Sequence, residues 1–366
     1  MKQRVSILFA LFLLLVTALP GLAKGDVRAA TAWLKSQVRA DGGFSDGFSD
    51  ASGVGPTVEV VLAAVATDED ISKWGSEKSP LDYLASNAAS ATTTGLLAKL
   101  ILTAKATGQD PRNFGGVNLV ERLQAQYDSS TGLYKGVLTE HAYAMLALKQ
   151  AGETIPPKAA EALIGFQDDA GGWSFDGTGQ ADTNTTALAI QALVAAREGP
   201  AGVPISKALT FLKTQQNTDG GFAYQMPSEF GTESDANSTA WVIQGLIAAN
   251  QKLDDWKSPQ EYLGSLQTEE GAFLWKSEVE GANFLATAQA LPALQGVTLV
   301  TLPTVLASKA PAPMAPAVTA PAAGNAATPG ALPTAGSDSS PWGALTALGL
   351  LLLLLGGGGL LRRTAR

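Results

Sequence analysis

Three acidic residues are spaced in a way that could build a ligand site. Asp182, Asp235 and Glu280 each precede a glutamine by nine residues, and Asn184 and Asn237 follow two of these acids. Carboxylate and amide oxygens bind Ca²⁺ and accept hydrogen bonds from sugar hydroxyls. The spacing therefore predicts a site for a cation or a polar ligand at one rim of the fold. The alternative is helix capping, because Asp and Asn before an apolar helix satisfy free backbone N–H groups.

Three further side chains are candidates for ligand contact. His141 is the single histidine and stands at the start of an apolar segment. It would have to be the base of any serine hydrolase triad, but the sequence has no nucleophile elbow, so a polar residue at a helix start is the alternative. Trp241 and Trp275 lie outside the repeated aromatic positions described below. We expect them to line a ligand surface or to join the core.

Composition excludes several kinds of chemistry. Without cysteine and with one histidine, the chain lacks the ligands of a zinc site, and thiol catalysis is excluded. A net charge of −8 argues against nucleic acid as a partner. A glycosidase needs two acids across a cleft. Glu59, Glu140 and Glu280 are possible by position, but their spacing selects no pair.

These residues lie within a repeated pattern of an apolar segment, a glutamine, a glycine turn and an aromatic residue. The clearest copies span 33–44, 163–173, 211–222 and 262–273, and weaker copies begin at 83 and 122. The glutamine of the pattern falls at 37, 126, 167, 215 and 267. The six units are about 46 residues apart, a spacing typical of two-helix repeats.

Each unit predicts two helices joined by a glycine turn. The first has apolar residues three and four apart, whereas the second is alanine-rich and apolar all round, as in 142–151, 185–196, 238–249 and 286–294. A helix without a polar face is buried. The sequence therefore predicts an all-α fold, an (α/α)6 toroid of six helix-pair repeats over residues 24–302. An open solenoid is the alternative, but it would need polar capping repeats.

The repeated pattern resembles the QW-type repeat of squalene–hopene cyclases and the related repeat of protein prenyltransferase β-subunits, over residues 26–300. Class II terpenoid cyclases carry Asp-any-Asp-Asp-Thr-Ala, whose central acid protonates an alkene. The matching segments 182–187 and 235–240 have Asn-Thr and Asn-Ser at the central positions. The resemblance therefore implies the fold without this acid. Prenyltransferase zinc ligands include a cysteine, so no zinc is expected.

The first 23 residues predict a secretory signal peptide. Lys2 and Arg4 precede an apolar run over 5–19, and small residues follow at 21–23. We expect the mature chain to begin near Lys24.

The last 64 residues predict an anchor. Residues 303–340 form an Ala/Pro-rich linker that ends near the motif Leu-Pro-Thr-Ala-Gly at 332–336. A transmembrane helix over 341–361 and a basic tail over 362–366 follow. The arrangement resembles a sortase sorting signal, with Ala335 where the usual motif has threonine. We expect an exported protein held at the cell surface by the membrane or, through sortase, by the cell wall.

These features predict a non-catalytic surface toroid that binds an unknown small molecule or glycan at the barrel mouth, with Ca²⁺ as the candidate metal ion. Two alternatives remain. One is a surface enzyme, either a polysaccharide hydrolase or lyase or a diverged terpenoid cyclase. The other is a purely structural repeat.

Overall fold

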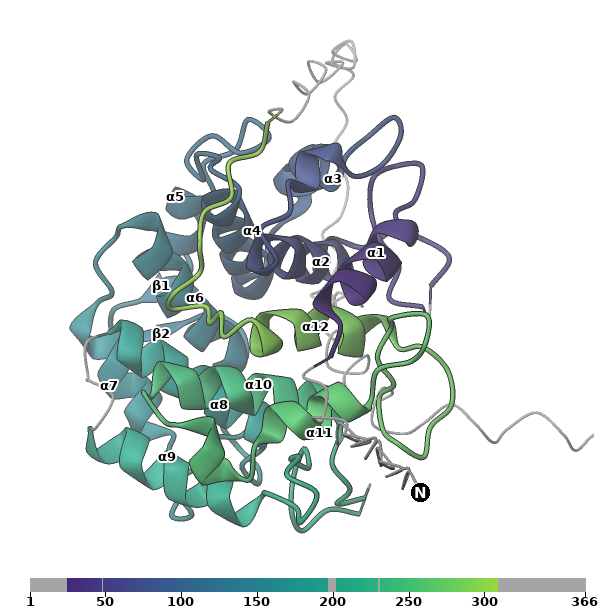
Figure 1. Cartoon of the computed structure of the whole chain (residues 1–366). Coiled ribbons are helices and arrows are strands. Elements are labelled where there is room, and N and C mark those ends of the chain that lie inside the picture. Colours follow the sequence, from purple (N-terminus) through teal and green to yellow (C-terminus); the bar gives the residue numbers. More distant parts are fainter. Residues whose placement is uncertain (1–24, 48, 197–201, 230, 309–366) are drawn as a thin grey trace, which may run out of the picture.

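The computed structural model describes residues 25–308 except 48, 197–201 and 230. Within them, twelve α-helices alternate along the chain between an outer and an inner ring (Figure 1). The outer helices are α1 (Val27–Ser36), α3 (Pro80–Asn87), α5 (Leu119–Gln124), α7 (Pro157–Gly165), α9 (Val203–Thr214) and α11 (Pro259–Ser265). The inner helices are α2 (Val54–Ala66), α4 (Thr94–Ala106), α6 (Leu138–Ala151), α8 (Thr183–Ala195), α10 (Ala236–Ala248) and α12 (Phe284–Leu294).

The remaining described elements are short. Strands β1 (Tyr127–Asp128) and β2 (Leu133–Tyr134) pair antiparallel in the third unit. The 3₁₀ helices are η1 (Ile71–Lys73), η2 (Ala88–Ser90) and η3 (Leu253–Trp256). The predicted signal peptide and transmembrane helix lie outside the described residues. Among the helices that are described, none combines the length and the apolar character needed to cross a bilayer.

The inner ring is closed. Each inner helix packs against the next one along the chain, and α12 packs against α2. The first and last units are also joined by Gln267, whose Nε2 donates to the carbonyls of Asp26 (2.8 Å) and Gly271 (2.9 Å). An open solenoid would leave these two units apart, so the closed toroid is the observed fold.

The same glutamine contact joins units within the ring. Gln167 Nε2 donates to the carbonyl of Gly171 in its own unit (2.7 Å) and to that of Pro204 in the next (2.8 Å). In the fifth unit Gln216 makes both contacts, not the Gln215 selected by the repeat pattern. In the fourth, fifth and sixth units a glutamine is therefore a link to the neighbouring unit, whereas Gln37 of the first unit donates within its own unit.

The turn glycine allows neighbouring units to approach closely. Gly171 has φ +96°, and a Cβ there would lie 2.5 Å from the carbonyl oxygen of Lys207 on the next outer helix. A side chain would be strained in this left-handed backbone and would also meet the neighbouring main chain. This explains why the pattern carries glycine at the turn.

The aromatic residue after the glycines belongs to the core. Trp173, Phe222 and Phe273 are fully buried. Their backbone N–H groups donate to threonine hydroxyls on the following inner helix, at 2.8–3.0 Å, and the acceptors are Thr186, Thr239 and Thr287. Each aromatic residue thus fixes an outer helix against the start of an inner one.

Candidate functional site

Asp182 and Asp235 are helix caps. Each carboxylate accepts a hydrogen bond from the backbone N–H three residues later, at 2.7 and 2.8 Å, and another from that residue's hydroxyl. Both side chains are buried, with 1% and 2% of their surface exposed. Their oxygens point to the first turns of α8 and α10, so the capping interpretation describes their contacts.

Burial also changes the acidity of these caps. It raises the pKa of Asp182 to about 6, although hydrogen bonds from Thr185 and Tyr224 act in the opposite direction. The pKa of Asp235 is raised for the same main reason. A carboxylate without a cationic partner costs free energy to bury, and this cost grows as the pH rises.

We therefore expect Asp182→Asn to remove part of the pH dependence of stability. The pKa of Asp182 is higher in the folded than in the unfolded protein. Its protonation therefore stabilises the fold fully below about pH 4, and this contribution is lost as the pH rises through about 6. Between pH 4 and 7 the wild type should lose about 2–3 kcal/mol relative to the variant, whose amide still caps the helix. Urea unfolding at both pH values measures this difference. Parallel curves for the two proteins would contradict the prediction.

Glu280 does not belong with these two acids. It lies in an exposed loop, three residues before Asn283, which is the residue that caps α12. Counting back from Gln289 misplaces it because Gln289 lies one turn earlier in its helix than Gln191 and Gln244 do in theirs. The three acids are therefore not equivalent by helix position, as the spacing predicted, because two of them cap their helices and Glu280 precedes the cap of α12. Among the described residues no group of three or more His, Asp or Glu side chains could hold a metal ion.

His141 occupies the position of the threonines that fix the repeat aromatics. Its Nδ1 accepts the backbone N–H of Tyr134 (3.2 Å), and its Nε2 lies 3.0 Å from the carbonyl of Ala159. This pairing assigns the proton to Nε2. Burial lowers the pKa of His141, so the neutral form is favoured. These contacts make it part of the repeat architecture.

The remaining sequence candidates divide into two kinds. Trp275 is buried, and its carbonyl accepts the N–H of Ala236 at the start of α10 (2.8 Å). Asn184, Asn237 and Trp241 are half-buried on the inner helices. These three side chains are therefore accessible near the ring interior.

The ring interior contains a layer of polar and aromatic side chains that we call the belt. Its members all lie six residues after the residue that caps their helix, on five of the six inner helices. They are Glu59 on α2, Lys99 on α4, Tyr143 on α6, Trp241 on α10 and Gln289 on α12. The equivalent residue of α8 is Leu188.

Contacts connect the belt around the axis. Lys99 Nζ lies 2.9 Å from Glu59 Oε1 and 5.0 Å from the centre of the Tyr143 ring. Tyr143 and Trp241 meet edge to face, with ring centres 6.2 Å apart. Gln289 donates to Glu59 Oε2 (3.4 Å) and accepts a hydrogen bond from Asn237 (2.9 Å). Hydrogen bonds within the belt therefore link α4, α2 and α12, and Asn237 extends this network to α10.

The two charged side chains of the belt, Lys99 and Glu59, form an ion pair. Burial alone would lower the pKa of Lys99, but Glu59, together with Tyr143 and Glu140, outweighs it, so the net pKa is raised and the ammonium stays charged. Glu140, beside the belt, accepts the N–H of Gly95 (3.3 Å), and burial raises its pKa. A Cβ at Gly95 or Gly136 would collide with the Glu140 carboxylate. Two acids thus lie on either side of one lysine.

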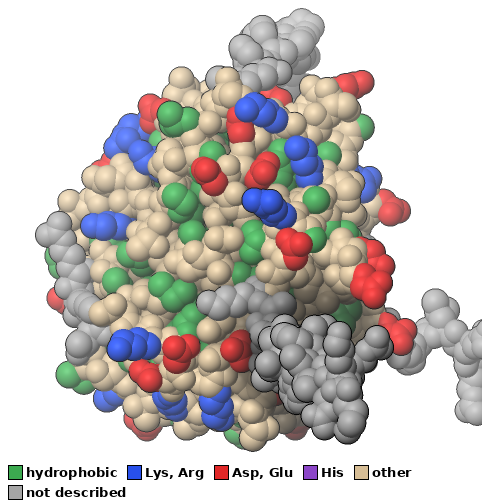
Figure 2. Space-filling model, viewed as in Figure 1, with side chains coloured by type: hydrophobic (Ala, Val, Ile, Leu, Met, Phe, Trp, Pro, Cys, Tyr) green, Lys and Arg blue, Asp and Glu red, His purple; other side chains and the backbone are tan. Residues whose placement is uncertain are grey.

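The end of the ring where α4 and α6 terminate is covered by residues 297–308, which we call the strap. It runs from α12 across the ring to the end of α4 (Figure 1). Where it is not overlain by grey atoms, the same face carries small hydrophobic patches between acidic and basic side chains (Figure 2). The strap therefore covers part of this end of the ring.

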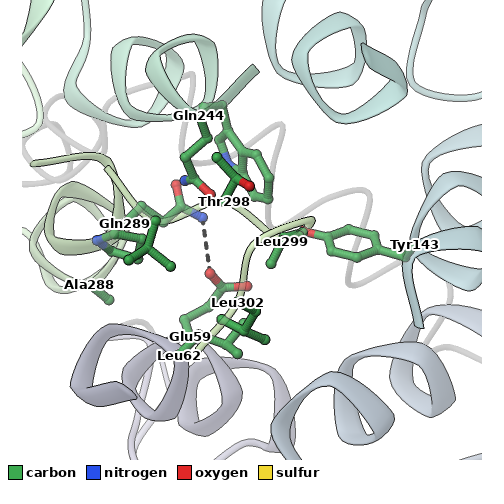
Figure 3. Close-up of a pocket in the computed structure, with 12 residues that line it drawn as sticks. Glu59, Leu62, Tyr143, Gln244, Ala288, Gln289, Thr298, Leu299 and Leu302 are labelled. Carbon is green, nitrogen blue, oxygen red and sulfur yellow. Dashed lines mark hydrogen bonds between the residues drawn. The ribbon is translucent and has the colours of Figure 1, made fainter. Parts of the chain in front are cut away.

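A small cavity remains between the belt and the strap. Glu59, Tyr143, Gln244 and Gln289 line it from the helices, and Thr298, Leu299 and Leu302 line it from the strap (Figure 3). Its volume is about 20 Å³, room for about one water molecule. A terpenoid does not fit in this space.

Polar groups surround the cavity. The Gln244 amide and the Tyr143 hydroxyl belong to side chains that line it. Gln191, fully buried nearby, leaves its Nε2 without an acceptor. Buried polar groups are nearly always satisfied, so the cavity is suited to a water molecule or to one polar group of a ligand.

Sequence reasoning missed Lys99, Tyr143 and Gln244 as members of this site. A usable signal exists, because polar or aromatic residues recur six positions after the helix caps on helices that are otherwise apolar. That register was obscured because Gly53 and Val137, which precede α2 and α6, are not typical capping residues.

Comparisons with known proteins agree with this architecture. A model of the squalene-hopene cyclase C-terminal domain matches residues 136–287, and one of the prenyltransferase alpha-alpha toroid domain matches residues 3–112. No curated protein matches the sequence.

Solved structures with this fold have different activities. The type II terpene cyclase MstE from Scytonema has a TM-score of 0.57 and 13% identity, over 74% of this chain and 96% of its own. Haptocorrin in complex with Cbi has a TM-score of 0.51 and 15% identity, and the match covers 76% of this chain and 67% of haptocorrin. A protein described as a wild-type glycosidase has a TM-score of 0.51 and 10% identity, and the match covers 75% of this chain and 96% of the glycosidase. Such identities show the fold alone. Together with the family models, the fold supports the terpenoid cyclase-like family of α/α toroids as the group that this chain resembles.

Proposed function

We propose that the protein is a non-catalytic binding protein that holds a saccharide at the mouth of the ring where the inner helices begin. The observation that carries this proposal is the polar lining of the cavity, to which Gln244 and Tyr143 contribute, beside the unpaired Gln191 Nε2. One hydroxyl of the ligand would enter the cavity, which holds no more than that. The rest of the ligand would lie over the belt.

The chemistry of the belt favours a sugar over an apolar ligand. Asn184 and Asn237 supply amides for hydroxyl groups, and Trp241 offers an aromatic face for the apolar side of a sugar ring. Pockets that recognise small molecules typically combine such an apolar surface with a few directed polar groups.

The contacts of the acids argue against catalysis. The Asp182 and Asp235 carboxylates are engaged in capping. Both oxygens of Glu59 are paired, one with Lys99 and the other with Gln289. An alkene-protonating acid needs a free proton aimed at the substrate, and the segments 182–187 and 235–240 carry no central acid for this role.

Binding can be tested with the purified protein and a panel of glucose, N-acetylglucosamine and their short oligomers, with tryptophan fluorescence and calorimetry as readouts. We expect Trp241→Ala and Gln244→Leu each to weaken the affinity by about tenfold or more, because each removes a central contact. Trp33→Ala, on an outer helix, is the matched control and should bind normally. Native mass spectrometry should detect any molecule retained during purification. A bare mass together with no saccharide binding would reject the proposal.

A hydrolase acting on surface polysaccharide is the second candidate. The placement of Glu59 and Glu140 on either side of Lys99 favours it. Burial raises the pKa of Glu140, which favours its protonated form, whereas Glu59 is ion-paired with Lys99. Two carboxyl groups in different environments are what a general acid and a general base require. Release of reducing sugar from oligosaccharides, abolished by Glu140→Gln, would establish this function instead.

We also propose that the ring is displayed on the cell surface. The support is the sequence of residues 1–23 and 303–366, which resembles a signal peptide and a sortase-type anchor. Cell fractionation tests this, and recovery of the intact chain from the cytoplasm would contradict it.

A further inference from the structure

The contacts of the strap resemble those of a bound peptide more than those of a loop. Gln150 Nε2 on α6 donates to the carbonyls of Leu299 (2.7 Å) and Val300 (3.1 Å). Gln191 Oε1 on α8 accepts the N–H of Leu299 (2.9 Å). Side chains from two helices therefore hold both main-chain groups of one strap residue.

Farther along, the strap pairs with exposed main chain at the end of α4. The N–H of Val305 donates to the carbonyl of Ala106 (2.8 Å), and that of Ala307 donates to the carbonyl of Thr107 (3.2 Å). Alternate residues of an extended chain thus satisfy carbonyls that a helix end leaves free. Most of the contacts are to main-chain groups, which any extended peptide possesses.

The ring also offers groups that the strap does not use. Gln191 Nε2 is buried without an acceptor among the described residues. Leu299 is 5% exposed and, with Leu302, fills the floor of the cavity. Hydrogen bonds for the main chain and a pocket lined by leucine side chains are features of a site that binds a peptide.

We propose that the end of the ring where α4 and α6 terminate is a binding site for an extended apolar peptide, and that residues 297–308 occupy it in cis. The strap is then released as a unit while the ring stays folded. The strap leucines line the cavity that the proposed saccharide hydroxyl would enter. The tests of the present inference need no saccharide, so the failure of either proposal can be told from the failure of the other.

Hydrogen exchange on the full chain tests the release of the strap. The amides of Leu299, Val305 and Ala307 should exchange before those of the inner helices. Gln150→Met should speed their exchange by about tenfold, because two hydrogen bonds to the strap are lost. Gln167→Met is the matched control, since Gln167 also donates to two carbonyls but lies between outer elements. It should leave the strap amides unchanged. Exchange of the strap at the rate of the inner helices in every protein would overturn the proposal.

The peptide site itself is tested in trans. In the full chain, Leu299→Ala with Leu302→Ala weakens the strap but leaves the ring side of the site intact. A labelled peptide with the sequence of residues 297–308 should then bind, whereas a scrambled peptide should not. Adding Gln150→Met should reduce this binding by about tenfold. Failure of the labelled peptide to bind the weakened protein, or equal binding of the scrambled peptide, would overturn the proposal.

Discussion

Gly271→Ala should destabilise the protein by about 3 kcal/mol, because it acts at the joint that closes the ring. Gly271 has φ +95°, and a Cβ there would lie 2.6 Å from the backbone of Ala29 on α1. The substitution therefore combines left-handed strain with a collision between main chains, and neither α1 nor the turn can move without losing the Gln267 contacts to Asp26 and Gly271. Urea unfolding measures the loss, and limited proteolysis should show early cleavage near α1.

The control for this prediction lies in the same loop. Gly281 has φ +101°, and nothing lies within 4 Å of a Cβ placed there. Gly281→Ala therefore carries the backbone strain without the collision, and should cost about 1 kcal/mol. Equal losses for the two variants would mean that contact between the first and last units contributes little to stability.

Trp173→Ala should cost about 3–5 kcal/mol, the usual range for removing a large buried aromatic side chain. Trp173 is fully buried, and its indole Nε1 donates to the carbonyl of Leu163 (2.7 Å). Its backbone N–H is bonded to Thr186 and stays in place, so the loss comes from the cavity and from the unpaired carbonyl. The free energy of unfolding from denaturant titration is the measurement.

Trp173→Phe separates these two contributions. Phe222 and Phe273 fill the same position in later units, so the site tolerates this ring. The substitution keeps most of the apolar contact and removes the indole hydrogen bond, and we expect a cost of about 1 kcal/mol. A loss as large as that of the alanine variant would show that the Leu163 contact dominates.

Much of the fold follows from local sequence patterns. Glycines that need positive φ mark the turns, and apolar residues all round a helix mark its burial, so six helix pairs in two rings can be predicted without coordinates. The capping role of Asp182 and Asp235 also follows from their place before an apolar helix. These features depend on residues that are neighbours along the chain.

The register of the inner helices was less accessible. The prediction that Glu280 lies at the rim assumed that Gln289 has the same position in its helix as Gln191 and Gln244. In the structure Asn283, and not Glu280, caps α12. An inner helix that is apolar all round has no polar stripe to show which residues face the axis. The local sequence pattern therefore predicts where an inner helix lies in the chain, but not which of its residues face the axis of the ring.

The sequence by itself determined the helix pairs of this protein, their order and the caps of α8 and α10, because these are set by interactions within a few residues. Tertiary structure alone decided the belt, where Glu59 meets Lys99 from 40 residues away and Gln289 from 230. It also decided the strap, whose contacts continue to Ser308, past the predicted boundary at 302. Closing the ring brings these distant segments together, and the partner of a polar group across a ring is not encoded in the period of either helix.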